Sequence, residues 1–139
     1  MISFNYETDF KLPNEDVLSK WISSIITLHN CKEDEISYVF CDDEYLHKLN
    51  VQFLNHDTLT DIISFDYTVG KNLQGDIFIS VERVEDNAKD LGLTFKEELH
   101  RVIIHGILHY CGFKDKTESD AKQMRLKEDE ALSLLQTML

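Results

Sequence analysis

Two histidines four residues apart are the strongest chemical signal in the 139-residue sequence. His105 and His109 lie in an apolar stretch that predicts a helix from Phe95 to about Cys111. Residues with this spacing project from one face of a helix, so both imidazoles can reach a single metal ion. Histidines that are satisfied by hydrogen bonds inside a structure show the same spacing, so the pair alone leaves a structural role open.

A third candidate ligand follows the predicted helix. We expect Gly112 to end the helix in a left-handed conformation, after which the chain can turn back and present Asp115 to the histidines. A carboxylate is a suitable third ligand for a divalent ion such as zinc. Three protein ligands leave a fourth position for water, which is the arrangement of a catalytic site. The alternative is an exposed turn residue between Lys114 and Lys116.

A glycine separates the two histidines inside the predicted helix. An interior glycine destabilises a helix by roughly 0.5–1 kcal/mol relative to alanine. Gly106 therefore predicts a close approach, either of a strand backbone or of the open cleft beside the histidines. The same position argues against a peptidase, because zinc peptidases of the HExxH type carry a glutamate beside the first histidine as the general base.

The remaining sequence predicts one α/β (α+β) domain over residues 1–139, with a small four-stranded mixed sheet and about five helices. Alternating apolar and polar residues predict strands at Ile2–Glu7, Ile36–Cys41, Asp61–Tyr67 and Asp76–Val81. Helical spacing and capping residues predict helices at 13–29, 42–49, 82–91, 95–111 and 117–135. The helix at 95–111 is apolar on nearly every side, so we expect it to be buried across the sheet.

Charge argues against ordinary nucleic-acid binding. Fourteen basic and 26 acidic residues give a net charge of −12, whereas nucleic-acid-binding domains are usually basic. Residues 1–82 carry a net −10 and residues 83–139 a net −2, so the second part is the better candidate for contact with a polyanion. We expect the acidic residues of the first part to lie mainly opposite the site, and Arg101, Lys114 and Lys116 to form a small positive rim. A charge that only confers solubility is the alternative.

Cysteine usage and hydropathy indicate a cytoplasmic protein. Cys31, Cys41 and Cys111 share no CxxC spacing and cannot all pair, which argues against a disulfide scaffold and for a reducing compartment. The first 20 residues lack the basic and apolar segments of a signal peptide, and no apolar run approaches the roughly 20 residues of a membrane span.

Four further histidines lack a partner at metal-binding spacing. We expect His29, His47 and His56 on the surface. His100 lies on a different helix face from His105, so a surface or supporting role is expected for it rather than metal binding.

The segment HGILHYCGFKD at 105–115 resembles the H-G-x-L-H-L-x-G-Y-D-H motif of the YbeY family. TDIISF at 60–65 is similar to that family's T-[DN]-V-L-S-F strand, and GDI at 75–77 is similar to its G-D-I strand start. Met124 and Glu128 fall where the family has a Met and a Glu. The similarity covers roughly residues 36–130.

The resemblance implies a single-strand-specific metallo-endoribonuclease that matures the 3′ end of small-subunit ribosomal RNA and acts in ribosome quality control. Ribosomal RNA and the ribosome would be its partners, with no membrane, and one zinc or other divalent ion its cofactor. It implies that the catalytic metal ligands are His105, His109 and Asp115. Our candidates for substrate binding are Ser64, Arg101, Lys114 and Lys116.

The sequence departs from the family pattern at three positions. Asp115 stands where the family usually has a third histidine, and Lys114 replaces the Asp before it. Leu54 falls where the family usually has an arginine proposed to aid catalysis, and leucine cannot bind phosphate. Two other functions therefore stay open: a different zinc-dependent hydrolase such as a peptidase, and a non-catalytic ribosome-associated factor with a structural metal.

Overall fold

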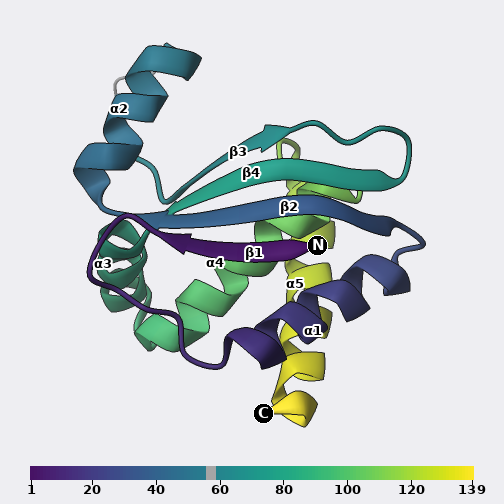
Figure 1. Ribbon diagram of the computed structural model, residues 1–139. Coiled ribbons are helices and arrows are strands. Elements are labelled where there is room, and N and C mark those ends of the chain that lie inside the picture. Colours follow the sequence, from purple (N-terminus) through teal and green to yellow (C-terminus); the bar gives the residue numbers. More distant parts are fainter. Residues whose placement is uncertain (56–58) are drawn as a thin grey trace.

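The computed structural model describes residues 1–55 and 59–139 (Figure 1). His56, which was expected on the surface, lies outside these residues. Within them the chain forms four strands and five helices, in the order β1 (Ile2–Tyr6), α1 (Glu15–Leu28), β2 (Lys32–Cys41), α2 (Asp43–Leu54), β3 (Ile62–Asp66), β4 (Asn72–Ser80), α3 (Val81–Leu91), α4 (Phe95–Tyr110) and α5 (Glu118–Met138). None of these helices has the length and hydrophobicity that a membrane span requires.

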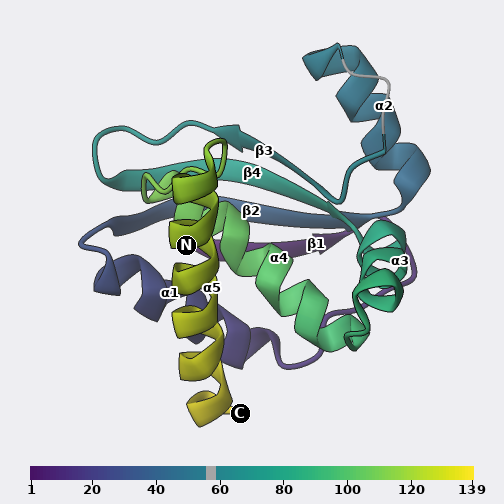
Figure 2. The ribbon, with the colours of Figure 1, turned by 180° about the vertical axis from the view of Figure 1, so that it is seen from behind.

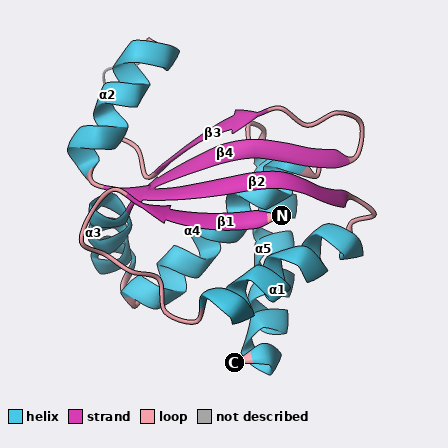
Figure 3. Ribbon diagram, viewed as in Figure 1, coloured by secondary structure: helices cyan, strands magenta, loops and turns pink. Residues whose placement is uncertain are grey.

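The described strands form one mixed sheet in the order β1-β2-β4-β3, as Figure 3 shows. β1, β2 and β4 are parallel, and β3 is antiparallel to β4. The predicted mixed four-stranded sheet is therefore confirmed. β2 begins at Lys32 rather than Ile36, because its first residues pair with β4 ahead of a register shift between Glu33 and Ile36. A bulge of this kind interrupts the period-two pattern on which the strand prediction depended.

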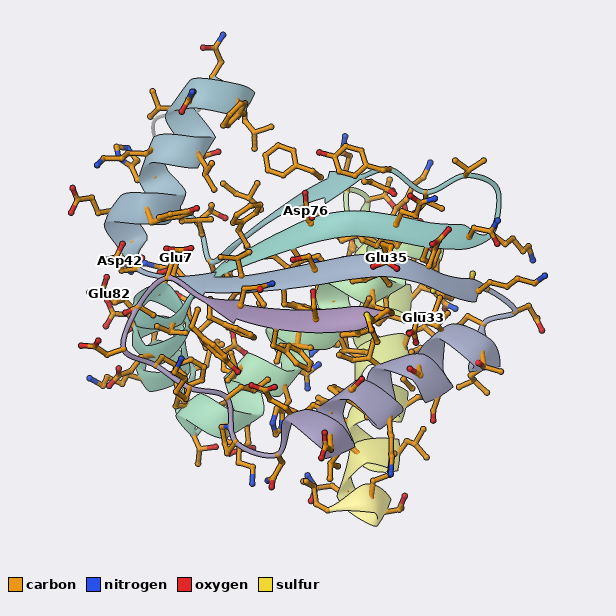
Figure 4. The ribbon with its side chains drawn as sticks, in the orientation of Figure 1. Glu7, Glu33, Glu35, Asp42, Asp76 and Glu82 are labelled. Atoms are coloured by element: carbon orange, nitrogen blue, oxygen red, sulfur yellow. The ribbon has the colours of Figure 1, made fainter. Side chains whose placement is uncertain are left out.

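Helices α1, α4 and α5 cover one face of the sheet (Figures 1 and 2). The side chains on the covered face of the two central strands are fully buried: Ile36, Tyr38, Phe40, Leu73, Ile77 and Ile79. Figure 4 shows six labelled carboxylates along the other face and the edges of the sheet, with α4 and α5 behind it: Glu7, Glu33, Glu35, Asp42, Asp76 and Glu82. These six follow the expectation that many acids of residues 1–82 lie away from the helix that carries the histidines.

Helix α4 is buried on nearly every side, as its sequence predicts. It begins with a capping box, in which the Thr94 hydroxyl accepts from the Glu97 N–H and the Glu97 carboxylate accepts from the Thr94 N–H. The Tyr38 hydroxyl donates to the Ile103 carbonyl oxygen at 2.8 Å and ties the middle of α4 to β2. The metal-binding candidates thus lie on a helix whose position is fixed from both sides.

Two glycines allow α4 to approach the sheet. A Cβ on Gly106 would lie 3.1 Å from Ile77 Cδ1 and 3.3 Å from Ile62 Cδ1. Gly106 therefore faces side chains of β4 and β3, and not a strand backbone or the open cleft as the sequence predicted. A Cβ on Gly75 would overlap the Tyr110 hydroxyl, which donates to the Phe65 carbonyl oxygen at 3.0 Å. The GDI segment thus leaves room for the last residue of α4.

Candidate metal centre

The three ligands expected from the sequence converge at the C-terminal end of α4. His105 Nε2 lies 3.0 Å from His109 Nε2, and each of these nitrogens lies 3.3 Å from Asp115 Oδ2. Among the residues that the structure describes, this is the one group of at least three potential ligands whose atoms lie within 4.8 Å of one another. The side chains are half-buried, with 23%, 32% and 41% exposed for His105, His109 and Asp115.

Local backbone geometry brings Asp115 to the histidines. Gly112 has a φ of +104°, a conformation that favours glycine, and its N–H donates to the His109 carbonyl oxygen at 3.0 Å. The Phe113 N–H donates to the Leu108 carbonyl oxygen at 3.0 Å and closes the end of the helix. The chain therefore reverses directly after α4, as Gly112 predicts.

Glu128 on α5 orients the first histidine. His105 Nδ1 lies 2.7 Å from Glu128 Oε2, and an ionised carboxylate can only accept, so Nδ1 carries the proton. The Nε2 lone pair of a neutral His105 then points toward His109 and Asp115, which is the usual support for a metal-bound histidine. Sequence reasoning placed Glu128 through the family resemblance and did not find this role, because the contact joins residues on two different helices.

The donor set fits a divalent ion. Donors at about 2.0–2.1 Å from a tetrahedral ion lie about 3.3 Å apart, close to the 3.0–3.3 Å separations here. Without a metal ion, the cluster lacks hydrogen-bond donors. His105 Nε2 is unprotonated, so it and the Asp115 carboxylate would both have to accept from the one N–H at His109 Nε2. Two imidazoles and one carboxylate suit zinc and its first-row neighbours.

The pKa shifts of His105 and Glu128 follow from the contact between them. Burial lowers the pKa of His105, but the hydrogen bond to Glu128 and the charges of Glu128, Asp115 and Asp61 raise it more, so the net pKa is raised. Burial raises the pKa of Glu128, but hydrogen bonds and charge from His105 and Arg101 outweigh it and the net pKa is lowered. Glu128 is therefore ionised at neutral pH, as an acceptor for His105 must be.

The expected positive rim is wrong for Arg101. Its guanidinium donates to Glu128 Oε1 and Asp129 Oδ1, both at 2.8 Å, and its side chain is only 17% exposed. Two carboxylates thus neutralise a charge that was expected to face a phosphate. Lys114 and Lys116 are exposed beside Asp115 and form no ion pair with any described residue.

The other sequence candidates are placed as follows. Ser64 is exposed on β3, and Leu54 is an exposed residue at the end of α2. His100 is buried rather than on the surface, with its ring edge-on to Trp21 at a centroid distance of 6.1 Å. Burial lowers the pKa of His100 to about 4.

A small acidic pocket lies beside the ligands and shares His105 with them. Its volume is about 180 Å³, and its lining includes three carboxylates: Asp61, Glu98 and Glu128. These three carboxylates do not fit the small positive rim that the sequence predicted, and Asp61 departs from the expectation that the acids of residues 1–82 lie opposite the site. Asp61 lies just before β3, and Glu98 lies two turns before His105, so helical spacing and strand position together bring the acids to this side of α4.

Comparisons with known proteins show which family the chain belongs to. The model of a family described as "Endoribonuclease YbeY" matches residues 3–136. Relatives named Endoribonuclease YbeY include one from Flavobacterium johnsoniae, 64% identical over 134 residues and 96% of both chains, and one from Porphyromonas gingivalis, 51% identical over 120 residues, 86% of this chain and 80% of the relative.

A solved structure has a similar fold. The solution structure of a Thermotoga maritima protein matches with a TM-score of 0.68 and 25% identity, over 99% of this chain and 93% of that one. Its likeness extends over nearly the whole fold, including the elements that carry the three candidate ligands. Together with a family match that spans residues 3–136, this shows that the chain belongs to the YbeY family.

Proposed function

We propose that this chain is a metal-dependent, single-strand-specific endoribonuclease in ribosomal RNA maturation, with His105, His109 and Asp115 as its metal ligands. The observation that carries the proposal is the convergence of these three donors at 3.0–3.3 Å, with His105 oriented by Glu128. The chain belongs to a family named for endoribonuclease activity, so it is a nuclease that hydrolyses RNA.

Each residue has a part in the proposed reaction. A bound divalent ion, zinc in our proposal, would supply Lewis acidity at the scissile phosphate. Glu128 keeps the proton of His105 on Nδ1 and so keeps Nε2 free to bind the ion. Lys114 and Lys116 flank Asp115 in the exposed turn, where they can neutralise phosphates on either side of the cleaved bond.

Local charge permits an acidic protein to act on RNA. Charges separated by more than a Debye length, roughly 8 Å at physiological salt, are largely screened. The six carboxylates labelled in Figure 4 lie along the other face and edges of the sheet, away from the helix that carries the histidines. Asp61, Glu98 and Glu128 lie beside His105, where Arg101 and Arg125 offset part of their charge. Two lysines make few phosphate contacts, so we expect a shallow salt dependence, since each phosphate neutralised on a single strand adds about 0.7 to the slope.

The biological context is part of the proposal. We place the cleavage at the 3′ end of small-subunit ribosomal RNA, with the ribosome as partner in maturation and quality control, in the cytoplasm where ribosomes assemble. The peptidase alternative is not favoured, because Gly106 replaces the general base of such enzymes and the relatives are named as nucleases. A purely structural metal is disfavoured by a set of three half-exposed ligands, since structural zinc sites are closed by four.

Metal content and cleavage of single-stranded and duplex RNA by the wild type and a His109→Ala variant test the proposal. We expect the wild type to bind one divalent ion and to cleave the single strand, and the variant to keep its circular dichroism spectrum but lose both metal and cleavage. His47→Ala, which removes an imidazole from α2, is the control and should keep both. Undiminished cleavage by a metal-free His109→Ala protein would overturn the proposal, as would a metal-loaded wild type that cleaves no RNA.

A further inference from the structure

Glu98 is a buried carboxyl group that the metal centre does not use. It lies on α4 with 6% of its surface exposed, and its Oε1 atom is enclosed without a hydrogen-bond partner among the described residues. Buried polar atoms are almost always paired in folded proteins, so an unpaired one indicates a missing partner. Burial raises the pKa of Glu98, and Asp61 raises it further against the charges of Arg101 and Arg125, so its carboxylate form has much to gain from N–H donors.

This carboxyl group lines the 180 Å³ pocket beside the metal ligands. The volume corresponds to about six water molecules at about 30 Å³ each, which is the scale of one heterocyclic ring system. Ile62, Leu91 and Val102 supply apolar wall, and His105 joins the pocket to the ligands. An occupant would therefore have an apolar body of about this size and a polar edge, and it would lie next to the candidate metal ligands.

Glu98 is the buried carboxylate of this pocket with an unpaired oxygen, whereas Asp61 is only partly buried and can be hydrated. Both oxygens of Glu128 are used, one by His105 and one by Arg101, and Arg101 is also held by Asp129. Arg125 is 58% exposed at the rim, 4.0 Å from Glu128. It is placed to cover the face of an occupant, as guanidinium groups do on nucleobases.

A second metal ion is a poor occupant. Among the described residues, the histidine cluster is the one set of three potential ligands within 4.8 Å of one another, so the carboxylates of this pocket do not converge on a common point. A ligand that brings its own N–H donors to one carboxylate fits better, because an ionised carboxylate has two oxygens that only accept.

We propose that this pocket binds one base of the RNA substrate next to the cleaved bond, and that Glu98 selects guanine. The N1–H and 2-amino groups of guanine are adjacent donors that match the two oxygens of a carboxylate once Glu98 turns its enclosed Oε1 toward the pocket. Adenine, cytosine and uracil present no such adjacent pair of donors. Single-stranded RNA is commonly recognised in this way, with an unstacked base held between side chains and read along its edge. The inference rests on the proposed function, because it places the neighbouring phosphate at the metal ligands.

Cleavage of a set of short single-stranded RNAs tests the proposal. The RNAs differ only in the base on either side of the mapped cleavage point, which is G, A, C, U or inosine. We expect kcat/KM to favour G over A by about tenfold or more at one of these positions, since a good bidentate pair discriminates by about 5- to 150-fold. Inosine keeps N1–H and lacks the 2-amino group, so it should fall between the two.

Variants of the protein then test whether Glu98 causes the preference for G. Glu98→Gln replaces one acceptor with a donor, so it should lose the preference for G and gain relative activity on A, which glutamine side chains pair well. Glu85→Gln removes the same charge from the exposed side of α3 and should keep the preference. If Glu98→Gln fails to fold, Leu91→Trp fills the pocket from a residue that is 58% exposed, and it should reduce discrimination in the same way.

Binding measurements distinguish a failure of this inference from a failure of the proposed function. Fluorescence anisotropy with the same RNAs and metal-free protein should show the same preference for G. If no RNA is cleaved but this preference persists, the proposed function fails and the pocket stands. Equal rates and affinities for all bases in the wild type overturn the pocket, and so does a preference for G that survives both Glu98→Gln and Leu91→Trp.

Discussion

His105 and His100 lie five residues apart on the same helix and have opposite environments. His105 is partly exposed, its Nδ1 is held by an ionised glutamate, and its pKa is raised. His100 is buried against Trp21, and burial lowers its pKa to about 4. The helix rotates each residue by about 100°, so five steps carry His100 away from the ligand cluster and toward α1. The partner on the neighbouring helix, Glu128 for His105 and Trp21 for His100, therefore sets the environment of each histidine.

The largest expected effect comes from removing each histidine in turn. His105→Ala deletes a ligand, and changes outside the ligands of metal sites already cost 10–100-fold, so we expect a loss of more than about 100-fold in kcat/KM for RNA cleavage. His100→Phe changes a packed residue and should leave cleavage within about threefold of the wild type. Comparable losses in the two variants, at equal folded fractions by circular dichroism, would contradict the different roles assigned to His105 and His100.

A smaller effect is expected from the glutamate that distinguishes the two histidines. Glu128→Gln removes the charge that holds the Nδ1 proton of His105 and leaves Arg101 with one carboxylate fewer. We expect affinity for zinc, measured by competition with a chelator, to fall by about 10–100-fold. Glu130→Gln, an exposed position on the same helix, is the matched control, and an equal fall there would show that net charge is responsible.

The burial of His100 makes the stability of the protein depend on pH. Its pKa is about 4 in the folded protein and about 6.5 in the unfolded chain, so the unfolded state takes up a proton first as the pH falls. The stabilisation is complete above about pH 6.5 and is lost between that pH and about 4, with about 2 kcal/mol lost by pH 5. Urea unfolding at pH 7.5 and pH 5 should show this loss, and His100→Phe should reduce it; an unchanged pH dependence in His100→Phe would contradict the assignment.

The smallest effect is expected at the glycine between the two ligands. The added methyl group of Gly106→Ala would lie 3.1 Å from Ile77 Cδ1 and 3.3 Å from Ile62 Cδ1, which are the ends of flexible side chains. Tight packing opposes a gain in helix propensity of roughly 0.5–1 kcal/mol, so the free energy of unfolding should change by less than about 1 kcal/mol. Cleavage should stay within about threefold, and a larger loss would mean that Gly106 serves the cleft rather than the packing of α4.

Sequence alone predicted what depends on local spacing. The two histidines, the glycine turn and Asp115 lie within eleven residues, so periodicity and turn chemistry suffice to bring them together. The mixed sheet was predicted from four short segments, but two strands begin four residues earlier than predicted. β2 begins at Lys32 and β4 at Asn72, because their first residues pair with each other ahead of the bulge near Glu33. Family resemblance added the positions of Met124 and Glu128.

Contacts between separate helices and strands could not be predicted from local spacing. Arg101 has the spacing of a residue beside His105, but its charge is taken by two carboxylates on α5 that no local pattern links to it. The burial of His100 depends on Trp21, 79 positions earlier in the chain. In the sequence, Glu98 does not differ from an exposed polar residue of a helix. It is buried because β3 and α5 pack against α4.

The dependence of His105 on Glu128 has a consequence for synthesis of the protein. A ribosome makes the chain from its N-terminus at about 5–20 residues per second, so Glu128 is joined about 1–5 seconds after His105. Until α5 has emerged and docked, His105 lacks the acceptor that fixes its Nδ1 proton, and the acidic pocket lacks one wall. A nascent chain that carries all three proposed ligands therefore still lacks the contact that orients His105. If the proposed metal site is correct, we expect full metal affinity only after α5 has docked in the final stage of folding.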